Sequence, residues 1–401
     1  MFLQRLLERN PELALAAVGL HQAGRVQANT YLIDLDTVTA NAVFIAAAAA
    51  AQGLSGYFMA KQYGRNPDTS AAVAAAGLPK AVCVDLQCLD AHRRHGIPIG
   101  HIGHLVQAPR GTEDAVLAAE PEVVTLFSIE AATRLAQAAR KRDKEQAVLL
   151  RVHAPGDAFY FGHGGGFPLA EIEAAAAEIQ RLGGLTVAGV TTFPCLLANA
   201  ARKKVEPTNN LLTLTEAAAR LRAAGYRITQ VNAPGTTSAQ TLRLLAAAGA
   251  THVEPGSALH GTTPEHIFDP AAPELPAIVL VSEVSHLDGD DAYIFAAGYY
   301  ADRVLGDYQL RAAIGHDDAL VERVLDVDTA PDGAIHYYCI ARAARQAGVR
   351  VGDTVVFCFR PQTFVTRART QAVAGVHAGT GLLPGQSYDQ EARPVYLEAQ
   401  P

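Results

Sequence analysis

Residues 147–193 contain a strand, a helix and a second strand in succession. They read AVLLRVH over 147–153, LAEIEAAAAEIQRL over 169–182 and TVAGVTTF over 186–193. The outer runs are short, apolar and rich in β-branched residues, as buried strands are. The middle run repeats its apolar residues at helical spacing and ends at Gly183, a frequent helix stop. This order predicts one unit of a parallel sheet, in which a helix connects two neighbouring strands.

The same alternation extends in both directions, from about residue 30 to about residue 260. Another helical run over 213–224 ends at Gly225. About eight strands fall in this region, which is the number that closes a (β/α)8 TIM barrel, so we predict that fold. The predicted barrel strands are 56–60, 81–85, 97–101, 123–127, 147–153, 186–193, 228–232 and 251–254.

The composition changes after Pro264. Four prolines between 264 and 276 crowd a predicted linker, and the following runs are mainly strand-like and separated by turns. We predict an α/β protein with a barrel over residues 30–268 and a C-terminal all-β domain over 269–401, on which the N-terminal segment 1–34 partly packs. The predicted strands of the β domain are 278–286, 292–300, 334–340, 354–360 and 370–376, joined by a strand at 30–34.

Composition excludes several classes of function. The chain has 401 residues, of which 49% are hydrophobic and 18% charged, as in a globular protein. A net charge of -7 argues against nucleic acid or an anionic membrane as the main partner, because both need clustered positive charge. The charged N-terminus and the lack of a long apolar run predict a cytoplasmic protein. The five cysteines lack a metal-binding spacing, so we expect thiols and no metal site.

Two positions at the ends of predicted strands indicate the chemistry. Lys61 follows the apolar run Tyr57-Phe58-Met59-Ala60, and Glu254-Pro255-Gly256-Ser257 follows the last barrel strand. A lysine placed this way can hold an aldehyde cofactor as a Schiff base, and the Glu-Pro-Gly turn can hold that cofactor's ring nitrogen and phosphate. Because TIM-barrel active sites lie at the carboxyl ends of the strands, these positions should converge. They point to pyridoxal 5'-phosphate.

Further motifs resemble one enzyme superfamily. Tyr31-Leu32-Ile33-Asp34-Leu35-Asp36 followed by Asn41 resembles its opening strand and first helix, and Gly165-Gly166-Phe167-Pro168 resembles its loop before a barrel helix. Over nearly its whole length the chain resembles the fold-type III pyridoxal-phosphate enzymes, the superfamily of alanine racemase and the basic amino-acid decarboxylases, and most closely the YhfX-like proteins. The resemblance implies an alanine racemase-like fold, pyridoxal 5'-phosphate as cofactor and Lys61 as the Schiff-base lysine.

The loop Asn232-Ala233-Pro234-Gly235-Thr236-Thr237-Ser238 resembles the superfamily's phosphate-binding loop after the seventh strand. A turn rich in glycine and hydroxyls that opens a helix offers N-H groups and the positive end of a helix dipole to a phosphate. The alternative is an ordinary N-cap at Thr237 or Ser238, and the two roles can coexist. The resemblance implies cofactor binding by Asn232, Thr236, Thr237, Ser238, Gly256 and Ser257.

Glu254 departs from the alanine racemases, which carry arginine before Pro-Gly, and agrees with the decarboxylases, which carry glutamate. A carboxylate beside the pyridine nitrogen raises that nitrogen's proton affinity, because opposite charges attract. The resemblance therefore implies that Glu254 keeps the ring protonated and makes it a full electron sink. The alternative is a solvated acid at a strand end.

Gly298-Tyr299-Tyr300-Ala301-Asp302 resembles the Gly-Tyr-x-Asp motif that supplies the catalytic tyrosine of alanine racemases. One extra residue leaves Tyr299 and Tyr300 both open as the counterpart. Alternation along a strand lets only one of them face inward, and the Gly-Tyr start favours Tyr299. Two packing aromatics are the alternative. In the superfamily this tyrosine reaches across a dimer interface, so the resemblance implies a homodimer with a shared active site.

Four other residues are candidates. His104, in Gly103-His104-Leu105-Val106-Gln107, resembles a motif of the superfamily's single-domain cofactor-binding members, which implies a place near the pocket. His163 could stack on the cofactor or contact substrate, or it could be a solvated loop residue. Arg65 and Arg360 could each bind a substrate carboxylate in bidentate fashion or form a surface ion pair.

The leading hypothesis is an amino-acid racemase or epimerase that removes the Cα proton of an external aldimine and returns a proton to the opposite face. A decarboxylase is second, favoured by Glu254, although the β domain lacks the decarboxylases' cysteine and aspartate motif. A D-amino-acid aldolase or dehydratase is third, but Arg360-Pro361-Gln362-Thr363-Phe364 replaces their Pro-x-His-x-Cys metal site. A cofactor-homeostasis protein is fourth, and the large β domain and the tyrosine motif count against it.

Overall fold

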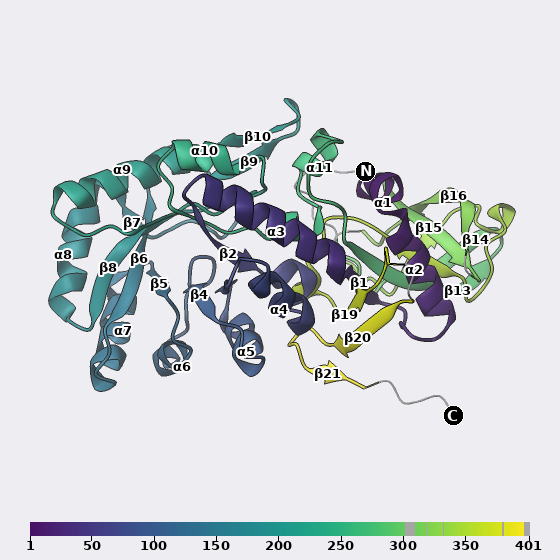
Figure 1. Ribbon diagram of the computed structural model, residues 1–401, viewed down its shortest axis with the longest axis horizontal. Helices are drawn as coiled ribbons and strands as arrows, with labels where there is room; N and C mark the ends of the chain where they lie inside the picture. The colour runs from purple at the N-terminus through teal and green to yellow at the C-terminus, as the bar shows by residue number, and fades with distance from the viewer. Residues whose placement is uncertain (301–308, 318, 332, 379–380, 397–401) are drawn as a thin grey trace. The chain divides into compact units, whose positions relative to one another are not determined.

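The computed structural model describes residues 1–300, 309–317, 319–331, 333–378 and 381–396 (Figure 1). The chain divides into two compact units. The barrel unit comprises Ala42–Ala60 and Val73–Gly256, and the β unit comprises Met1–Asn41, Lys61–Ala72 and Ser257–Pro401. Each unit contains its own cluster of buried apolar side chains, so each has a core to fold around.

The barrel unit is built on eight parallel strands that close into a ring. Hydrogen-bonded neighbours follow the order β5-β4-β3-β2-β12-β11-β8-β6, and β6 pairs with β5 to complete the circle. This arrangement confirms the predicted barrel, and every predicted barrel strand overlaps an observed one. The strands are β2 (Ser55–Met59), β3 (Lys80–Cys83), β4 (Ile99–Ile102), β5 (Val123–Leu126), β6 (Gln146–His153), β8 (Leu185–Thr191), β11 (Gln230–Asn232) and β12 (His252–Val253).

Local sequence explains where the barrel helices begin and end. Asp85 accepts a hydrogen bond from the backbone N-H of Cys88 at 2.7 Å and thereby caps α5. Helix α8 ends at Gly183, whose φ of 68° suits glycine. Figure 1 shows these helices on the outside of the strands. They are α5 (Leu86–Arg94), α6 (Glu113–Ala118), α7 (Ile129–Lys141), α8 (Ile172–Leu182), α9 (Asn209–Ala223) and α10 (Leu242–Ala247).

Some elements near the barrel are not predicted from the sequence. A hairpin of β9 (Leu196–Asn199) and β10 (Lys204–Pro207) lies between β8 and α9, and β7 (Phe167–Pro168) pairs with the end of β6. Two helices, α3 (Leu35–Ala51) and α4 (Pro67–Ala75), each contain a boundary between the two units. The hairpin and β7 have too few residues for a hydrophobic period to show. Helix α3 is different, because it contains Asn41 and corresponds to the first helix that the resemblance implies.

The β unit contains a ten-stranded sheet in the order β14-β17-β16-β15-β18-β13-β1-β19-β20-β21. The N-terminal strand β1 lies within it, antiparallel to β13 and parallel to β19. Helices α1 (Phe2–Arg9) and α2 (Pro11–Gln22) place Leu6 and Leu13 in the same apolar cluster as Val281. The remaining bounds are β1 (Thr30–Asp34), α11 (Glu265–Phe268), β13 (Ile278–Asp288), β14 (Asp291–Phe295), β15 (Leu310–His316), β16 (Ala319–Asp328), β17 (Tyr338–Ala341), β18 (Thr354–Phe357), β19 (Arg369–Ala374), β20 (Leu383–Tyr388) and β21 (Pro394–Val395).

Four predicted strands of the β unit are longer than the observed ones, and those over 354–360 and 370–376 end early, at Phe357 and Ala374. The strand predicted over 292–300 ends at Phe295, because the N-H of Tyr299 turns back to the carbonyl of Ala296 at 3.1 Å. The strand predicted over 334–340 begins only at Tyr338. Strands β15, β16, β20 and β21 are not predicted at all, although β15 and β16 form a long antiparallel pair.

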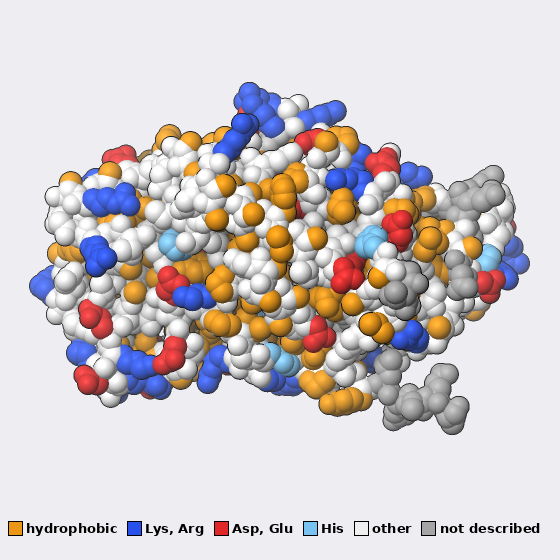
Figure 2. Space-filling model, in the orientation of Figure 1, with side chains coloured by type: hydrophobic (Ala, Val, Ile, Leu, Met, Phe, Trp, Pro, Cys, Tyr) orange, Lys and Arg blue, Asp and Glu red, His pale blue; other side chains and the backbone are white. Residues whose placement is uncertain are grey.

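Acidic and basic side chains are interspersed on the face of the barrel unit drawn in Figure 2. Several charged side chains of the barrel unit are paired, including Arg134 with Glu113 at 2.8 Å and Arg142 with Asp114 at 2.7 Å. Among the described residues, the helices are too short or too polar for any of them to cross a membrane.

Candidate active site

Three polar side chains meet at the carboxyl ends of strands β4, β11 and β12. Glu254, the first residue after β12, accepts a hydrogen bond from Asn232 Nδ2 at 2.9 Å through Oε1, and His101 Nδ1 lies 2.6 Å from the same oxygen. Strands β3 and β2 separate β4 from β12 in the ring, so the contact between His101 and Glu254 crosses the barrel interior. The side chains of His101 and Glu254 are 0% and 1% exposed.

The second oxygen of Glu254 is differently placed. Oε2 lies 3.4 Å from Nδ1 of His104 but has no hydrogen bond within the described part of the chain. Burial raises the pKa of Glu254, but attraction to His104 and His101 and the hydrogen bonds from His101 and Asn232 outweigh it, so the pKa lies below its usual value. The carboxylate is therefore ionised at neutral pH, with one oxygen suited to a further N-H donor.

His101 is held at both ring nitrogens. Its Nδ1 contacts Glu254, and its Nε2 lies 2.5 Å from the hydroxyl oxygen of Thr125 in β5. A carboxylate can only accept, so the proton in the first contact lies on Nδ1. The ring of His104 stacks on that of His101, with centroids 5.0 Å apart and an interplanar angle of 25°. His104, which is expected near the pocket, therefore lies next to His101 and Glu254.

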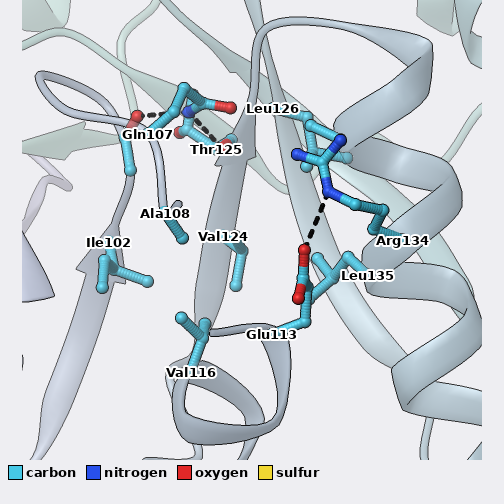
Figure 3. Close-up of a pocket in the computed structure, with 12 residues that line it drawn as sticks. Ile102, Gln107, Ala108, Glu113, Val116, Val124, Thr125, Leu126, Arg134 and Leu135 are labelled. Carbon is cyan, nitrogen blue, oxygen red and sulfur yellow. Dashed lines mark hydrogen bonds and ion pairs between the residues drawn. The ribbon is translucent and has the colours of Figure 1, made fainter. Parts of the chain in front are cut away.

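The loop that carries His104 is tied to β5 by Gln107. Its Nε2 donates to the carbonyl of Gly103 at 2.7 Å and to that of Thr125 at 2.9 Å (Figure 3). Gly103 has a φ of 98°, and a Cβ there would lie 2.8 Å from the carbonyl oxygen of Thr125, so only glycine fits. Beside this loop, Arg134 of α7 donates to Glu113 of α6 (Figure 3). These contacts fix the loop that leads from His101 to His104.

Arg151 is a cation buried inside strand β6. Its guanidinium donates to three backbone carbonyls, those of His104 and His163 at 2.9 Å and that of Phe193 at 3.1 Å. Burial lowers its pKa to about 10, which still leaves it charged at neutral pH. One side chain therefore joins the loops that follow β4, β6 and β8 at the carboxyl end of the barrel.

His163 lies in an aromatic group at this end of the barrel. Its ring centroid is 5.7 Å from that of Phe193 and 5.9 Å from that of Tyr160, and Phe193 is also 6.0 Å from His104. His163 is partly buried against these two rings, and its carbonyl is bound by Arg151. Whether it contacts a cofactor or a substrate stays a prediction.

The loop after β11, which is predicted to bind phosphate, contains two residues with positive φ. Gly235 has a φ of 127° and Thr236 a φ of 38°, and the buried hydroxyl of Thr237 lacks a hydrogen-bond partner in the described structure. The backbone N-H of Ser238 donates to Thr241 Oγ1 at 2.9 Å. Helix α10 begins at Leu242. The alternative of an N-cap at Thr237 or Ser238 is therefore wrong. The prediction that a helix starts directly after this turn is wrong as well.

Lys61 and Glu254 follow neighbouring strands. Strand β2 pairs with β12, with Gly56 opposite Val253, and the N-H of Met59 donates to the carbonyl of Pro255 at 2.9 Å. Lys61 is the second residue after β2, and Glu254 is the first after β12. Because parallel strands end at the same side of a sheet, both residues emerge at the carboxyl end of the barrel.

The turn that follows Glu254 crosses from one unit to the other. Gly256 is the last residue of the barrel unit, and Ser257 is the first of the β unit's C-terminal part. Ser257 is buried, and its hydroxyl has no hydrogen-bond partner among the residues described. This hydroxyl, like that of Thr237, is a donor suited to an anion.

Lys61 opens a short 3-10 helix, Lys61–Tyr63, in the β unit. Its Nζ lies 5.5 Å from the ring centroid of Phe364, and the guanidinium of Arg65 lies 5.7 Å from the same centroid. Arg65 is buried and donates to the carbonyl of Gln390 at 2.7 Å, so the alternative of a surface ion pair is wrong for it. Thr363 donates to the carbonyl of Gln62 at 2.5 Å. The segment 360–364, which replaces the metal motif of the aldolases and dehydratases, therefore packs on the turn that begins at Lys61.

The two candidate tyrosines differ in exposure. Tyr299 is 9% exposed and its ring lies 5.3 Å from that of Phe359, whereas Tyr300 is 48% exposed. Strand alternation does not distinguish them, because residues 296–300 lie beyond β14. Tyr31 donates to the carbonyl of Gly298 at 2.6 Å and anchors the turn before them. Ala301 and Asp302 of the predicted motif lie outside the described residues.

Arg360, the other predicted partner of a substrate carboxylate, lies near His260 in the β unit. Burial, and after it the positive charge of Arg360, lowers the pKa of His260 to about 3. His260 is therefore neutral at physiological pH. This places an uncharged imidazole beside a charged guanidinium.

Three residues of the site are not predicted from the sequence, namely His101, Thr125 and Arg151. For two of them the sequence holds a signal, which is a polar residue inside an apolar strand. These are the histidine in Ile-Gly-His-Ile and the arginine in Val-Leu-Leu-Arg-Val. A buried parallel strand should be apolar at such positions. Thr125 gives no such signal, since threonine is common in strands.

Comparison with known proteins shows the family to which the chain belongs. Residues 33–264 match the alanine racemase N-terminal domain family, and residues 279–383 match the YhfX-like C-terminal domain. The chain is 37% identical over 390 residues to the uncharacterized protein YhfX of Escherichia coli strain K12, covering 97% of this chain and 98% of that protein. The chain is a YhfX-like member of the alanine racemase N-terminal domain family.

Solved structures share the fold of this YhfX-like protein. D-threonine aldolase from Filomicrobium marinum matches with a TM-score of 0.67 and 16% identity, covering 92% of this chain and 96% of the aldolase. Alanine racemase from Corynebacterium glutamicum matches with a TM-score of 0.61 and 17% identity, covering 82% of this chain and 90% of the racemase. At these identities the likeness is one of fold, which carries several reactions.

Proposed function

We propose that this YhfX-like protein is a pyridoxal 5'-phosphate-dependent amino-acid racemase or epimerase. The observation that carries the proposal is the pairing of Lys61 and Glu254 at the ends of two neighbouring barrel strands. Glu254 is buried, has a lowered pKa and keeps one oxygen without a hydrogen bond among the described residues. A lysine and a buried acceptor that follow two neighbouring strands are the two groups that this cofactor needs.

The residues present fit the cofactor. A protonated ring nitrogen needs a buried acceptor, which Glu254 Oε2 offers. A phosphate needs donors, which the hydroxyls of Thr237 and Ser257 and the N-H groups of the glycine-containing loop offer. Asn232 and His101 hold the other oxygen of Glu254, so the carboxylate is oriented before anything binds. When bound, pyridoxal 5'-phosphate supplies an electron sink that makes the substrate's Cα-H bond acidic.

The protein's own residues then divide the proton transfers. In this proposal the amine of Lys61 takes or gives the Cα proton on one face. A tyrosine hydroxyl serves the other face, with Tyr299 favoured by the Gly-Tyr start of its motif and Tyr300 as the alternative. We propose that this tyrosine comes from a second copy of the chain, in a homodimer. Arg65 and Arg360 are the proposed partners of the substrate carboxylate.

A decarboxylase is the second candidate, and Glu254 is the observation that favours it. A buried carboxylate partner strengthens the electron sink, which suits loss of CO2 as well as loss of a proton. The two reactions differ in which Cα bond breaks, and therefore in the groups that face each side of Cα. The tyrosine motif favours the racemase, because a second base is needed only when the configuration inverts.

The test is incubation of the purified protein, loaded with pyridoxal 5'-phosphate, with L- and D-amino acids in D2O. NMR follows deuterium at Cα and chiral analysis follows configuration. Deuterium with inversion is expected and would name the substrate. Loss of the carboxylate would establish the decarboxylase, and loss of the β-substituent would establish a lyase. Binding of the cofactor without exchange in any amino acid would contradict the proposal and favour a binding role.

Two tyrosine variants locate the second base. Tyr299→Phe should stop racemisation while deuterium exchange on one face continues, because Lys61 is intact. Tyr300→Phe is the matched control, since it removes the same hydroxyl from the adjacent residue. The reverse pattern would transfer the role to Tyr300, and full racemisation in both variants would exclude this motif.

A further inference from the structure

A second group of possible ligands lies in the barrel unit and shares no residue with the candidate active site. Cys83 ends strand β3, and Cys88 and His92 lie on helix α5, four residues apart. One donor atom from each, two sulfurs and a ring nitrogen, lie within 4.8 Å of one another. Cys83 and Cys88 are 0% exposed and His92 is 1% exposed. The fold thus gathers two thiols and an imidazole inside the core.

The turn between β3 and α5 fixes this grouping. Asp85 caps the helix through the N-H of Cys88, and the N-H of Leu89 donates to the carbonyl of Asp85 at 3.1 Å. Residues four apart on a helix share a face, so Cys88 and His92 point the same way. The ring of His92 meets that of Phe58 edge to face, with centroids 6.0 Å apart. Three donors are therefore held on a short, rigid segment.

His92 supplies an independent sign that something is bound there. Its Nε2 is buried and has no hydrogen-bond partner among the described residues. A buried ring nitrogen without a partner costs free energy, and native proteins seldom leave one. A metal ion would satisfy it, since imidazole nitrogen and cysteine sulfur are the commonest ligands of zinc.

We propose that Cys83, Cys88 and His92 bind one Zn2+ ion. Binding forms two Zn-S bonds and one Zn-N bond and releases the two thiol protons to solvent. Two thiolates neutralise the charge of a divalent ion, which makes Zn2+ better suited to a buried site than a monovalent ion, whose complex would stay charged. The ion would join the end of β3 to α5.

The geometry requires a small contraction. Zn-S bonds of about 2.3 Å set ligand atoms about 3.8 Å apart at a tetrahedral centre. The three donors span up to 4.8 Å, so side-chain rotation must bring them about 1 Å closer. Three protein ligands are one fewer than structural zinc sites have, so we expect weaker binding than in a zinc finger. The spacing Cys-x4-Cys-x3-His is also unlike the zinc patterns sought in the sequence.

The experiment measures metal in the whole protein. Because the donors are buried, the ion should enter as the chain folds, so the protein is expressed with added Zn2+ or Co2+ and purified under reducing conditions. We expect about one metal ion per chain by mass spectrometry. The Co2+ form should show the thiolate-to-cobalt charge-transfer band, which reports sulfur ligation directly.

Variants assign the ion to these residues. Cys88→Ala and His92→Gln should each lose most of the metal, whereas Cys339→Ala, which removes an equally buried thiol from the β unit, should keep it. His92→Gln keeps a polar side chain of similar length, so it decides the matter if Cys88→Ala does not fold.

Four results would overturn the proposal. One is a folded wild-type protein that stays metal-free after growth with Zn2+ or Co2+, and another is a disulfide between Cys83 and Cys88. A third is copper in place of zinc. The fourth is metal that survives in His92→Gln but is lost in His101→Gln, because the donors of His101, His104 and Glu254 also lie within 4.8 Å of one another.

Discussion

The two ends of the barrel each hold a glutamate among polar neighbours, but only one of these glutamates keeps an oxygen without a hydrogen bond in the described structure. At the amino end, Glu122 accepts from Lys80 at 2.6 Å through Oε2 and from Gln230 at 3.0 Å through Oε1. At the carboxyl end, both hydrogen-bond contacts of Glu254 use Oε1, and Oε2 has none. Each oxygen of Glu122 therefore has a hydrogen-bond partner, whereas one oxygen of Glu254 has none among the described residues.

The same strands supply both networks. Strand β11 carries Gln230 at one end and Asn232 at the other, and β12 carries His252 beside the amino-end network and leads into Glu254. The side chain of Glu122 is 36% exposed and adjoins a cavity of about 330 Å³, whereas that of Glu254 is 1% exposed. Glu122 and Glu254 thus lie in different surroundings, and in our proposal only Glu254 takes part in the chemistry. Matched substitutions at the two ends test this contrast.

The largest expected difference is between the two lysines. Lys61→Ala should abolish the absorbance of lysine-bound cofactor at about 420 nm, because the lysine that forms the linkage is lost. Turnover should fall by ~10²-fold to 10⁴-fold, because one proton-transfer group is lost. Lys80→Ala, at the amino end, should leave both unchanged. Absorbance spectra and α-deuterium exchange check this. A chromophore that survives in Lys61→Ala would remove Lys61 from the site.

The two glutamates should differ next. Glu254→Gln keeps the shape of the side chain but removes its charge, so turnover should fall about 10²-fold to 10³-fold, as when a preorganised electrostatic group is lost. Glu122→Gln should change turnover by less than about threefold, because its carboxylate already has partners for both oxygens. Equal losses from the two variants would mean that Glu254 acts through stability alone. Rates measured on protein shown by circular dichroism to be folded make the comparison.

A smaller difference separates two threonines, each of which contacts a histidine. Thr125 Oγ1 lies 2.5 Å from Nε2 of His101, and Thr251 Oγ1 lies 2.9 Å from Nδ1 of His252. Thr125→Val should lower turnover by about tenfold, because a hydrogen bond to a group in a charged network contributes about 1.5 kcal/mol. Thr251→Val, its control, should alter unfolding stability more than turnover. A Thr125→Val enzyme with wild-type rates would exclude His101 from supporting Glu254.

The smallest expected difference between the two glutamates is in how the free energy of unfolding changes with pH. The pKa of Glu254 lies below its usual 4.5, so the unfolded chain takes up this proton first as the pH falls. The stabilisation from Glu254 is complete above about pH 4.5 and is lost as the pH falls through the folded-state pKa. Urea unfolding from pH 7 to pH 3 should therefore show a flatter loss of stability in Glu254→Gln than in wild type. Glu122, whose pKa is also lowered but whose side chain is partly exposed, should show a weaker version.

The sequence predicts the barrel well because its strands are continuous apolar runs separated by helices with capping residues, as at Asp85 and Gly183. Lys61 and Glu254 are candidates for a related reason, since each ends such a run and Glu254 precedes a Pro-Gly turn. The β unit is harder, because pairing of distant strands such as β1 with β13 leaves no local period.

Other parts of the site depend on contacts that no sequence pattern specifies. His101 reaches Glu254 across the barrel, 153 positions along the chain, so only the closed ring reveals their contact. Tyr299 and Tyr300 resist assignment because β14 ends at Phe295 and the residues after it follow a turn. Cys83, Cys88 and His92 likewise gather only when α5 folds back against β3.

In the proposed function, Lys61 holds pyridoxal 5'-phosphate at the carboxyl end of the barrel. The most direct test is to reduce the cofactor-loaded protein with borohydride, which makes the lysine linkage permanent, and to map the modified peptide by mass spectrometry. We expect a single pyridoxyl group on Lys61. A protein that carries no such group, or carries it on Lys80 or another lysine, would show that Lys61 does not hold the cofactor.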